Sequence, residues 1–244
     1  MTTRKKGPEL APDRQFESFN QAVQAAMVSN APLNERLGVV WGAVQTFRPR
    51  SAEAVGQLVE RLESHAAGST APKVGEQMPG FLLPDEQGRL VSLTGLLREG
   101  PVVISFQRGH WCPYCRISTI GLVEVQDEIS AAGAQLVVIM PERRRFATLL
   151  KEGTGARFPF LSDIDNGYAL SLDLVMWVGS RMKELMAETG IDLSEYQDNE
   201  SWFLPIPATF VVGSDGIVKA RYVDPDYRRR MEIADLLAAV RRAR

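Results

Sequence analysis

The chain has 244 residues, with 28 Lys and Arg against 30 Asp and Glu, a net charge of −2, and 45% hydrophobic residues. These values are typical of a soluble globular protein whose core needs no disulfide or metal support. A near-neutral charge argues against nucleic acid or an anionic membrane as the main partner, and no apolar run is long enough to cross a bilayer.

The first third of the chain is predicted to be helical. Residues 1–15 are polar, and we expect a loose tail there with no secretory signal. Apolar residues then recur at spacings of three and four, which predicts three amphipathic helices, beginning near Phe16, Leu33 and Val55. Gly, Pro and Ser interrupt this pattern over 65–80, which indicates a linker.

The pattern after the linker is that of an α/β domain. We therefore divide the chain into a tail and helical extension, 1–72, and a domain, 73–244. Strands that alternate with helices before a closing hairpin predict a mixed sheet flanked by helices. In chain order we expect a hairpin at 81–93, a strand at 101–106, a helix at 113–131, a strand at 135–140, a helix at 142–151, an extended piece at 158–163, a helix at 166–190, an irregular aromatic-rich segment at 191–205, strands at 208–213 and 217–223, and a last helix around 233–240.

The chain has two cysteines, Cys112 and Cys115, in a C-x-x-C arrangement. None is left over for a structural disulfide framework, so we expect a cytoplasmic protein, in a compartment that keeps thiols reduced. Near a βαβ pattern in such a protein, this spacing indicates a redox motif.

The predicted position of Cys112 favours its thiolate. The preceding strand leads through a short turn to Pro113, which suits the first position of a helix. The sulfur of Cys112 then lies at the positive end of the helix dipole, where its pKa falls. Three basic residues can add positive potential nearby: Arg108, His110 and Arg116.

Cys115 follows one helical turn later, on the buried side of the helix. It is placed to attack a mixed disulfide on Cys112, which would leave a Cys112–Cys115 disulfide. A structural zinc site is the alternative, but it needs four ligands, and His65 and His110 are the only histidines available. We therefore expect no metal and no cofactor beyond the redox-active cysteine pair.

Several segments together resemble the thioredoxin superfamily. Within it, the chain is most similar to peroxiredoxin-like proteins of the alkyl hydroperoxide reductase and thiol-specific antioxidant family. The resemblance implies a thioredoxin-like fold and an antioxidant oxidoreductase that reduces peroxides or disulfides, with a thioredoxin- or glutathione-type electron donor. The matching segments are FLLPDEQGRLVSL, PVVISFQRG, WCPYC, GAQLVVIMPE, FPFLSD and PIPATFVVGSDGIV.

The resemblance also implies roles for single residues. Cys112 corresponds to the attacking cysteine and Cys115 to the resolving one, and Trp111 would shield the sulfur and contact a substrate. Pro207 corresponds to the cis-proline of thioredoxin-like sites, where the backbone of Ile206 would bind an extended substrate segment. The alternative for Pro207 is a proline at the entry of a strand.

The chain departs from typical peroxiredoxins at two positions. Gly109 stands where they carry a Thr or Ser hydroxyl, and Ser105 stands where they carry a proline. Arg108 or Arg221 could supply the arginine that completes a peroxide site. The family resemblance thus favours peroxide reduction, whereas the local sequence resembles a site of thiol–disulfide exchange.

The helical extension leaves a second hypothesis open. Its apolar stripes must be covered by the domain, by a second copy in a homodimer, or by a partner. The protein could therefore be a redox-switched binding or regulatory module on a thioredoxin scaffold.

Two further groups of residues are predicted to serve the structure. The arginine runs 143–145 and 228–230 are interpreted as a solvated face or an interface, because the net charge is negative. Core packing is favoured over a substrate pocket for the aromatic residues of the 166–205 segment, which are Trp177, Tyr196, Trp202 and Phe203.

Overall fold

The computed structural model describes residues 16–243, so the predicted N-terminal tail lies outside the described residues. The helices are α1 (Phe19–Val28), α2 (Leu33–Phe47), α3 (Pro49–Ser64), α4 (Leu93–Leu97), α5 (Pro113–Ala131), α6 (Arg144–Thr154), the 3-10 helix η1 (Ile164–Asn166), α7 (Gly167–Ser171), α8 (Ser180–Glu188), α9 (Leu193–Gln197) and α10 (Ile233–Arg242). The strands are β1 (Leu82–Pro84), β2 (Leu90–Ser92), β3 (Val102–Phe106), β4 (Gln135–Met140), β5 (Phe160–Ser162), β6 (Val175–Trp177), β7 (Phe203–Pro205), β8 (Ala208–Val212) and β9 (Val218–Val223).

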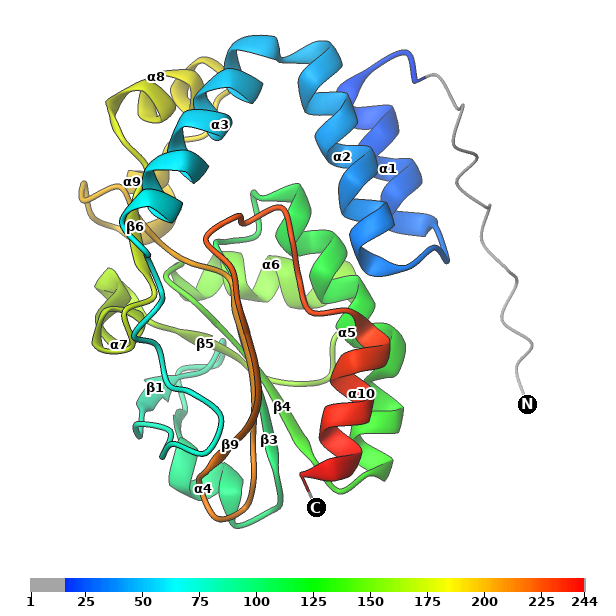
Figure 1. Ribbon diagram of the computed structural model, residues 1–244, viewed down its shortest axis with the longest axis vertical. Helices are drawn as coiled ribbons and strands as arrows, with labels where there is room; N and C mark the ends of the chain where they lie inside the picture. The colour runs from blue at the N-terminus through cyan, green and yellow to red at the C-terminus, as the bar shows by residue number, and fades with distance from the viewer. Residues whose placement is uncertain (1–15, 244) are drawn as a thin grey trace.

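A five-stranded mixed sheet with the order β5-β4-β3-β8-β9 forms the centre of the molecule (Figure 1). β3, β4 and β5 are parallel, whereas β8 and β9 form the antiparallel closing hairpin. The sequence predicted this arrangement, because the βαβ order requires parallel strands and the turn at 214–216 requires an antiparallel pair. In the residues that the structure describes, no helix is long and apolar enough to cross a membrane.

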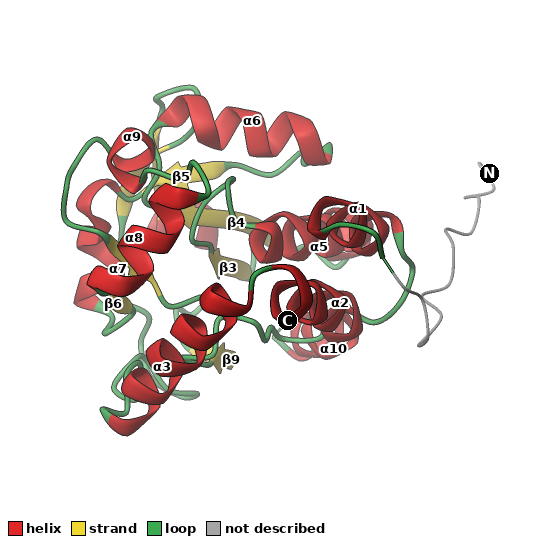
Figure 2. Ribbon diagram, turned by 90° about the horizontal axis from the view of Figure 1, so that it is seen from above, coloured by secondary structure: helices red, strands yellow, loops and turns green. Residues whose placement is uncertain are grey.

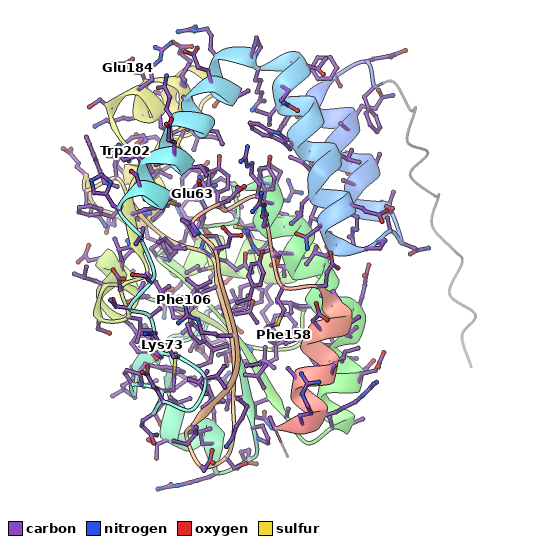
Figure 3. The ribbon with its side chains drawn as sticks, viewed as in Figure 1. Glu63, Lys73, Phe106, Phe158, Glu184 and Trp202 are labelled. Atoms are coloured by element: carbon purple, nitrogen blue, oxygen red, sulfur yellow. The ribbon has the colours of Figure 1, made fainter. Side chains whose placement is uncertain are left out.

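The central strand β3 separates two hydrophobic cores. Val102, Ile104 and Phe106 contribute to one core, and Val103 contributes to the other, because successive side chains of a strand point to opposite faces. Helices α5, α6 and α10 cover the face on which Val103 lies. Phe106 of the first core and Phe158 of the second are labelled in Figure 3. Burial on both faces explains the continuous apolar run of this strand.

The helical extension packs onto the domain rather than standing apart from it. Helices α1 and α2 contact α5, and α3 contacts α8, so the extension lies across one end of the molecule (Figures 1 and 2). Leu37 of the extension and Ile117 of α5 belong to the same core. The apolar stripes of these helices are therefore covered within the chain, and the boundary between 1–72 and 73–244 stays a prediction.

One buried arginine connects the extension to the domain. Arg36 of α2 donates hydrogen bonds to the carbonyl oxygens of Ala26 (2.9 Å) and Met27 (3.1 Å). Its guanidinium also forms an ion pair with Glu124 of α5 at 3.2 Å. A single side chain thus holds the end of α1 and joins α2 to α5.

The segment 166–205 differs from the prediction of one helix followed by irregular chain. It contains three helices and the two strands β6 and β7, which pair Val175 with Pro205 and Trp177 with Phe203. The partner of β6 lies far along the chain, so local periodicity could not reveal the pairing. Core packing is confirmed for Trp202, which is buried, whereas Trp177 and Phe203 are 47% and 41% exposed.

Candidate functional site

The two cysteines lie where β3 leads into α5. Cys112 is the N-cap residue of α5, and Pro113 occupies the first helical position, as the sequence predicts. Both cysteines are free thiols, and both are buried: Cys112 is 1% exposed and Cys115 is 0% exposed. The sulfur-bearing residue Cys112 therefore lies at the positive end of a long helix, shielded from bulk water.

Arg108 is the basic residue that contacts both cysteines. Its Nη1 lies 3.9 Å from the Sγ of Cys112, and its backbone N–H donates a hydrogen bond to the Sγ of Cys115 at 3.3 Å. The guanidinium is 3% exposed and lies 3.7 Å from the centre of the Tyr227 ring. Of the two arginines considered from the sequence, Arg221 lies elsewhere and donates to the carbonyl oxygen of Ala71.

The surroundings give the two cysteines opposite acidities. Burial raises the pKa of Cys112, but the hydrogen bond from Cys115 and the positive charge of Arg108 outweigh it and bring the pKa to about 6. Burial and the neighbouring Cys112 thiolate hold the pKa of Cys115 well above its usual value. At neutral pH the pair is therefore a Cys112 thiolate beside a Cys115 thiol.

Arg230 is a site residue that the sequence analysis missed. Its Nη2 lies 3.9 Å from the Sγ of Cys115, and its side chain donates to the backbone oxygens of Tyr227 and Arg229. Arg230 is 3% exposed, so the interpretation of the run 228–230 as a solvated face or an interface is wrong for this residue. The chain between β9 and α10 brings Arg230 to the cysteines, and nothing in the local sequence indicates that.

His110 contributes to the loop in a different way from the one predicted. Its backbone N–H and its Nδ1 lie 2.8 Å and 3.3 Å from the carboxylate oxygens of Glu142, and its ring stacks on Phe146. Glu142 is fully buried, and burial raises its pKa. This pair anchors the loop before Cys112, whereas Arg108 supplies the positive charge next to the sulfur.

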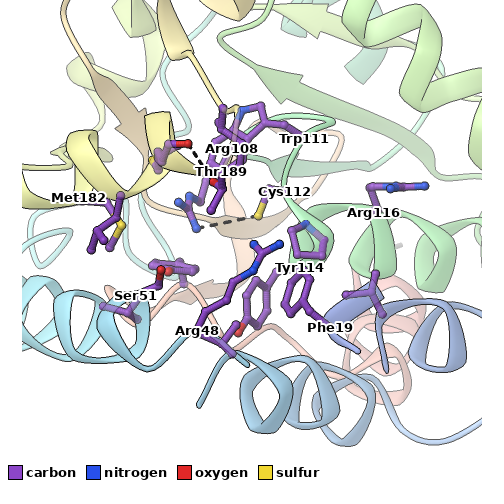
Figure 4. A pocket seen from close by; sticks show the side chains of 18 of the residues that line it. Phe19, Arg48, Ser51, Arg108, Trp111, Cys112, Tyr114, Arg116, Met182 and Thr189 are labelled. Atoms are coloured by element: carbon purple, nitrogen blue, oxygen red, sulfur yellow. Dashed lines mark hydrogen bonds between the residues drawn. The ribbon is translucent and has the colours of Figure 1, made fainter. Parts of the chain in front are cut away.

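A cavity of about 270 Å³ lies beside Cys112 (Figure 4). Trp111, Arg108 and Arg116 line it, in agreement with their predicted place near the sulfur. The extension and α8 supply most of the remaining wall, so segments far apart in the sequence enclose the cavity. Those wall residues include Phe19, Val23, Arg48 and Val55 of the extension and Met182, Leu185 and Met186 of α8.

Pro207 and Ile206 differ from the prediction. All peptide bonds in residues 16–243 are trans, so the prediction of a cis-proline at Pro207 is wrong, and Pro207 directly precedes β8 as a strand-entry proline. The backbone N–H of Ile206 donates to the carbonyl oxygen of Leu174 at 2.7 Å. Neither residue lines the cavity. The hydrogen bond next to the β6–β7 strand pair therefore occupies the N–H group that was predicted to bind substrate.

Gly109 has no room for the hydroxyl that typical peroxiredoxins carry at this position. Its φ is +148°, and an added Cβ would lie 2.5 Å from Oε1 of Glu142 and 2.6 Å from Nε1 of Trp111. We expect Gly109→Thr to lower the free energy of unfolding by about 2–4 kcal/mol, through backbone strain and overpacking, and to slow the reaction of Cys112.

Denaturant unfolding and stopped-flow oxidation test this expectation. Gly153→Thr is the control, because a Cβ at Gly153 meets nothing within 4 Å, and its effect should stay within about 1 kcal/mol. A Gly109→Thr protein of unchanged stability that reacts faster with peroxide would contradict the steric explanation.

The alternative of a zinc site finds no ligand set in the structure. Among residues 16–243, no three His, Cys, Asp or Glu side chains form a group that could hold a metal ion. His110 is bonded to Glu142, and the positive groups nearest the two sulfurs are arginines. The arginines next to the two sulfurs favour a thiolate there.

Comparison with known proteins agrees with this geometry. The AhpC/TSA family matches residues 74–221, which include both cysteines. A Mycobacterium tuberculosis protein that carries a peroxiredoxin name is 28% identical over 149 residues, which are 61% of this chain and 83% of that protein. Peroxiredoxin Bcp of Escherichia coli K12 is 30% identical over 94 residues, which are 38% of this chain and 60% of that protein.

Solved structures show the same fold. The crystal structure of peroxidoxin BcpB from Mycobacterium tuberculosis matches with a TM-score of 0.55 at 24% identity, over 71% of this chain and 99% of that one. Peroxiredoxin Q of Xanthomonas campestris matches with a TM-score of 0.51 at 17% identity, over 67% of this chain and 92% of that one. The chain therefore belongs to the AhpC/TSA family, the peroxiredoxin group of thiol oxidoreductases with a thioredoxin-like fold.

Proposed function

We propose that the protein is a thiol peroxidase that reduces small hydroperoxides at Cys112 and closes a Cys112–Cys115 disulfide. The observation that carries this proposal is the Cys112 thiolate at a pKa of about 6, with the buried guanidinium of Arg108 beside it. A small peroxide suits the site better than a protein disulfide, because Cys112 is 1% exposed and is reached through a cavity of about 270 Å³.

In the first step, the Cys112 thiolate attacks the terminal oxygen of the hydroperoxide. An S–O bond forms, the O–O bond breaks, and the leaving alkoxide takes a proton from water and departs as an alcohol. Cys112 becomes a sulfenic acid, so the sulfur is oxidised by two electrons and the peroxide is reduced by two. Arg108 can stabilise the negative charge that develops on the oxygens, because its guanidinium already lies at the sulfur.

In the second step, Cys115 resolves the sulfenic acid. The Cys115 thiol loses its proton, its sulfur attacks the sulfur of Cys112, and hydroxide leaves and takes up that proton as water. The positive charge of Arg230, 3.9 Å from Cys115, favours the thiolate that this attack needs. A thioredoxin-type dithiol or two glutathione-type thiols then supply two electrons and two protons, which restore both cysteines.

Thiol–disulfide exchange is the second candidate. Gly109 favours it, because no hydroxyl can stand where typical peroxiredoxins have one. In this case a small disulfide would enter the cavity, and the Cys112 thiolate would attack it and form a mixed disulfide. Cys115 would then displace the second half of the mixed disulfide as a thiol.

Rapid mixing of reduced protein with hydrogen peroxide, and separately with a small disulfide, tests the proposal. Trp111 lines the cavity next to Cys112, so its fluorescence reports the reaction. We expect the wild type to react with peroxide far faster than an ordinary thiol, Cys112→Ser to lose this phase, and Cys115→Ser to react once without turning over. Slow reaction with peroxide and fast reaction with the disulfide would instead establish the second candidate.

Three statements from the sequence stay predictions: the cytoplasmic location, a homodimer, and redox-controlled binding through α1–α3. The last has a structural basis, because Phe19, Arg48 and Val55 of the extension line the same cavity as Cys112. Hydrogen exchange of the reduced and the oxidised protein tests it. Identical exchange across α1–α3 in the two states would remove the switch hypothesis.

A further inference from the structure

Basic side chains gather around the cavity beside Cys112, although the chain carries a net charge of −2. Three arginines line it, namely Arg48, Arg108 and Arg116, and no Asp or Glu does. Within residues 16–243, none of the three forms an ion pair with a carboxylate. Guanidinium groups that are partly buried without carboxylates favour an anionic ligand.

The three arginines differ in their position and in the groups they contact. Arg108 is already engaged with the sulfur of Cys112 and the ring of Tyr227. Arg116 lies on α5, on the far side of Tyr114 from Arg108 in Figure 4. Arg48 projects from the junction of α2 and α3 into the space below Cys112. Within the described residues, Arg48 thus extends into the space beside Cys112 with no sulfur and no carboxylate as its partner.

The position of Arg48 is held by its neighbours. Its guanidinium carbon lies 3.9 Å from the centre of the Phe19 ring, so α1 supports the side chain from below. Its backbone N–H donates to the carbonyl oxygen of Val44, and Pro49 begins α3 directly after it. Burial lowers the pKa of Arg48, as expected for a guanidinium that has lost water and gained no carboxylate.

The opposite wall of the cavity is apolar. Met182, Leu185 and Met186 of α8 line it together with Ile191. Methionine side chains adapt their shape to different hydrocarbon groups. At about 270 Å³, the cavity is near the lower end of the range for small-molecule sites, which suits a short hydrocarbon chain better than a long one.

We propose that Arg48 binds the carboxylate of an amphipathic hydroperoxide, whose short hydrocarbon chain packs on α8 while its peroxide group reaches Cys112. This inference rests on the proposed function and names the substrate class of the same site. Arg48 lies outside the family match at 74–221, so the helical extension supplies the contact to the carboxylate, and the family domain supplies the α8 wall and the reactive thiol. A glutathione-type thiol also carries carboxylates, but it lacks the hydrocarbon chain that the α8 wall accommodates.

Two matched substrates test the proposal: a hydroperoxide of a medium-chain fatty acid and the methyl ester of the same compound. Stopped-flow fluorescence gives the second-order rate constant for the oxidation of Cys112 by each. We expect the wild type to react about tenfold faster with the acid than with the ester, which corresponds to about 1.4 kcal/mol. Arg48→Gln should bring the ratio of the two rates close to one, and Arg48→Lys should keep part of the preference.

Arg181→Gln is the matched control. Arg181 lies on α8, its side chain is half-exposed, and it pairs with Glu184 of its own helix outside the cavity. This variant should keep the wild-type ratio. Thermal unfolding of each variant shows whether the protein is folded. If Arg48→Gln does not fold, the comparison of wild type with Arg48→Lys still tests the proposal. Equal rates for acid and ester in the wild type would overturn the proposal.

A second measurement separates this inference from the proposed function. Octanoate and octanol have no peroxide group and cannot oxidise Cys112, so any binding to reduced protein can be followed by the fluorescence of Trp111. If neither hydroperoxide oxidises Cys112, the proposed function fails, while octanoate binding that Arg48→Gln weakens about tenfold still supports the carboxylate site. If glutathione does not displace bound octanoate, the result supports the proposal. If glutathione binds in a way that depends on Arg48 and octanoate does not bind, the site belongs to the reductant and the proposal is overturned.

Discussion

Replacing Arg108 with methionine is expected to raise the pKa of Cys112 from about 6 toward about 8, near the value of an unperturbed thiol. Burial already opposes the thiolate, and the substitution removes one of the two main groups that offset it, leaving the hydrogen bond from Cys115. At pH 7 the thiolate fraction falls by about tenfold, and the loss of charge beside the peroxide oxygens slows the step further. This is the largest effect on activity that we expect outside the cysteines.

The pH dependence of the reaction measures this effect. A thiolate exists above its pKa, so the wild-type rate should rise through pH 6 and then level off, whereas the rate of Arg108→Met should still rise above pH 7. Arg116→Met is the control, because Arg116 lines the same cavity and has no contact with either sulfur in the described part of the chain. A Cys112 that still titrates near pH 6 in Arg108→Met would show that the hydrogen bond from Cys115 is sufficient.

Replacing Arg36 with alanine is expected to lower the free energy of unfolding by about 3–5 kcal/mol. The substitution removes the ion pair with Glu124 and leaves the carbonyl oxygens of Ala26 and Met27 without their donor. Because α1 and α2 supply part of the cavity wall, loosening them should also expose Cys112. We therefore expect a bulky thiol reagent to react faster with Cys112 in this variant.

Urea unfolding and thiol-labelling rates provide the two measurements. Arg50→Ala is the control, since Arg50 and Glu188 form an ion pair between side chains that are 60% and 51% exposed. Exposed pairs of this kind contribute about 0–1 kcal/mol. If Arg36→Ala is as stable as Arg50→Ala and Cys112 is labelled no faster, the extension is not held to the domain by Arg36.

Local sequence signals predicted the place of the two cysteines in the fold correctly. Pro113 at the first helical position predicted where α5 begins, and this start places Cys112 at the helix N-terminus and Cys115 one turn inside. The continuous apolar runs at β3 and β4 predicted buried central strands, because strands covered on both faces carry apolar residues at every position. These features depend on neighbouring residues, which a sequence displays directly.

Local sequence signals could not predict contacts between segments that are far apart in the chain. The pairing of β6 with β7 and the approach of Arg230 to Cys115 join residues with no periodic relation to each other. The same pairing explains why the prediction for Ile206 failed, since the N–H of Ile206 is bonded to Leu174.

The sequence by itself determined the order of the strands and helices of the central sheet, the family resemblance and the position of the two cysteines at the start of α5, because each depends on adjacent residues or on a regular spacing. Only the tertiary structure decided that Arg108 rather than Arg221 lies at Cys112, that Arg230 lies at Cys115, and that Arg48 shares a cavity with Cys112. The physical reason is that burial of apolar surface brings the extension, α8 and the β9–α10 connection around one thiol. The arginines come close to the thiol as a result of this packing, which no local sequence pattern predicts.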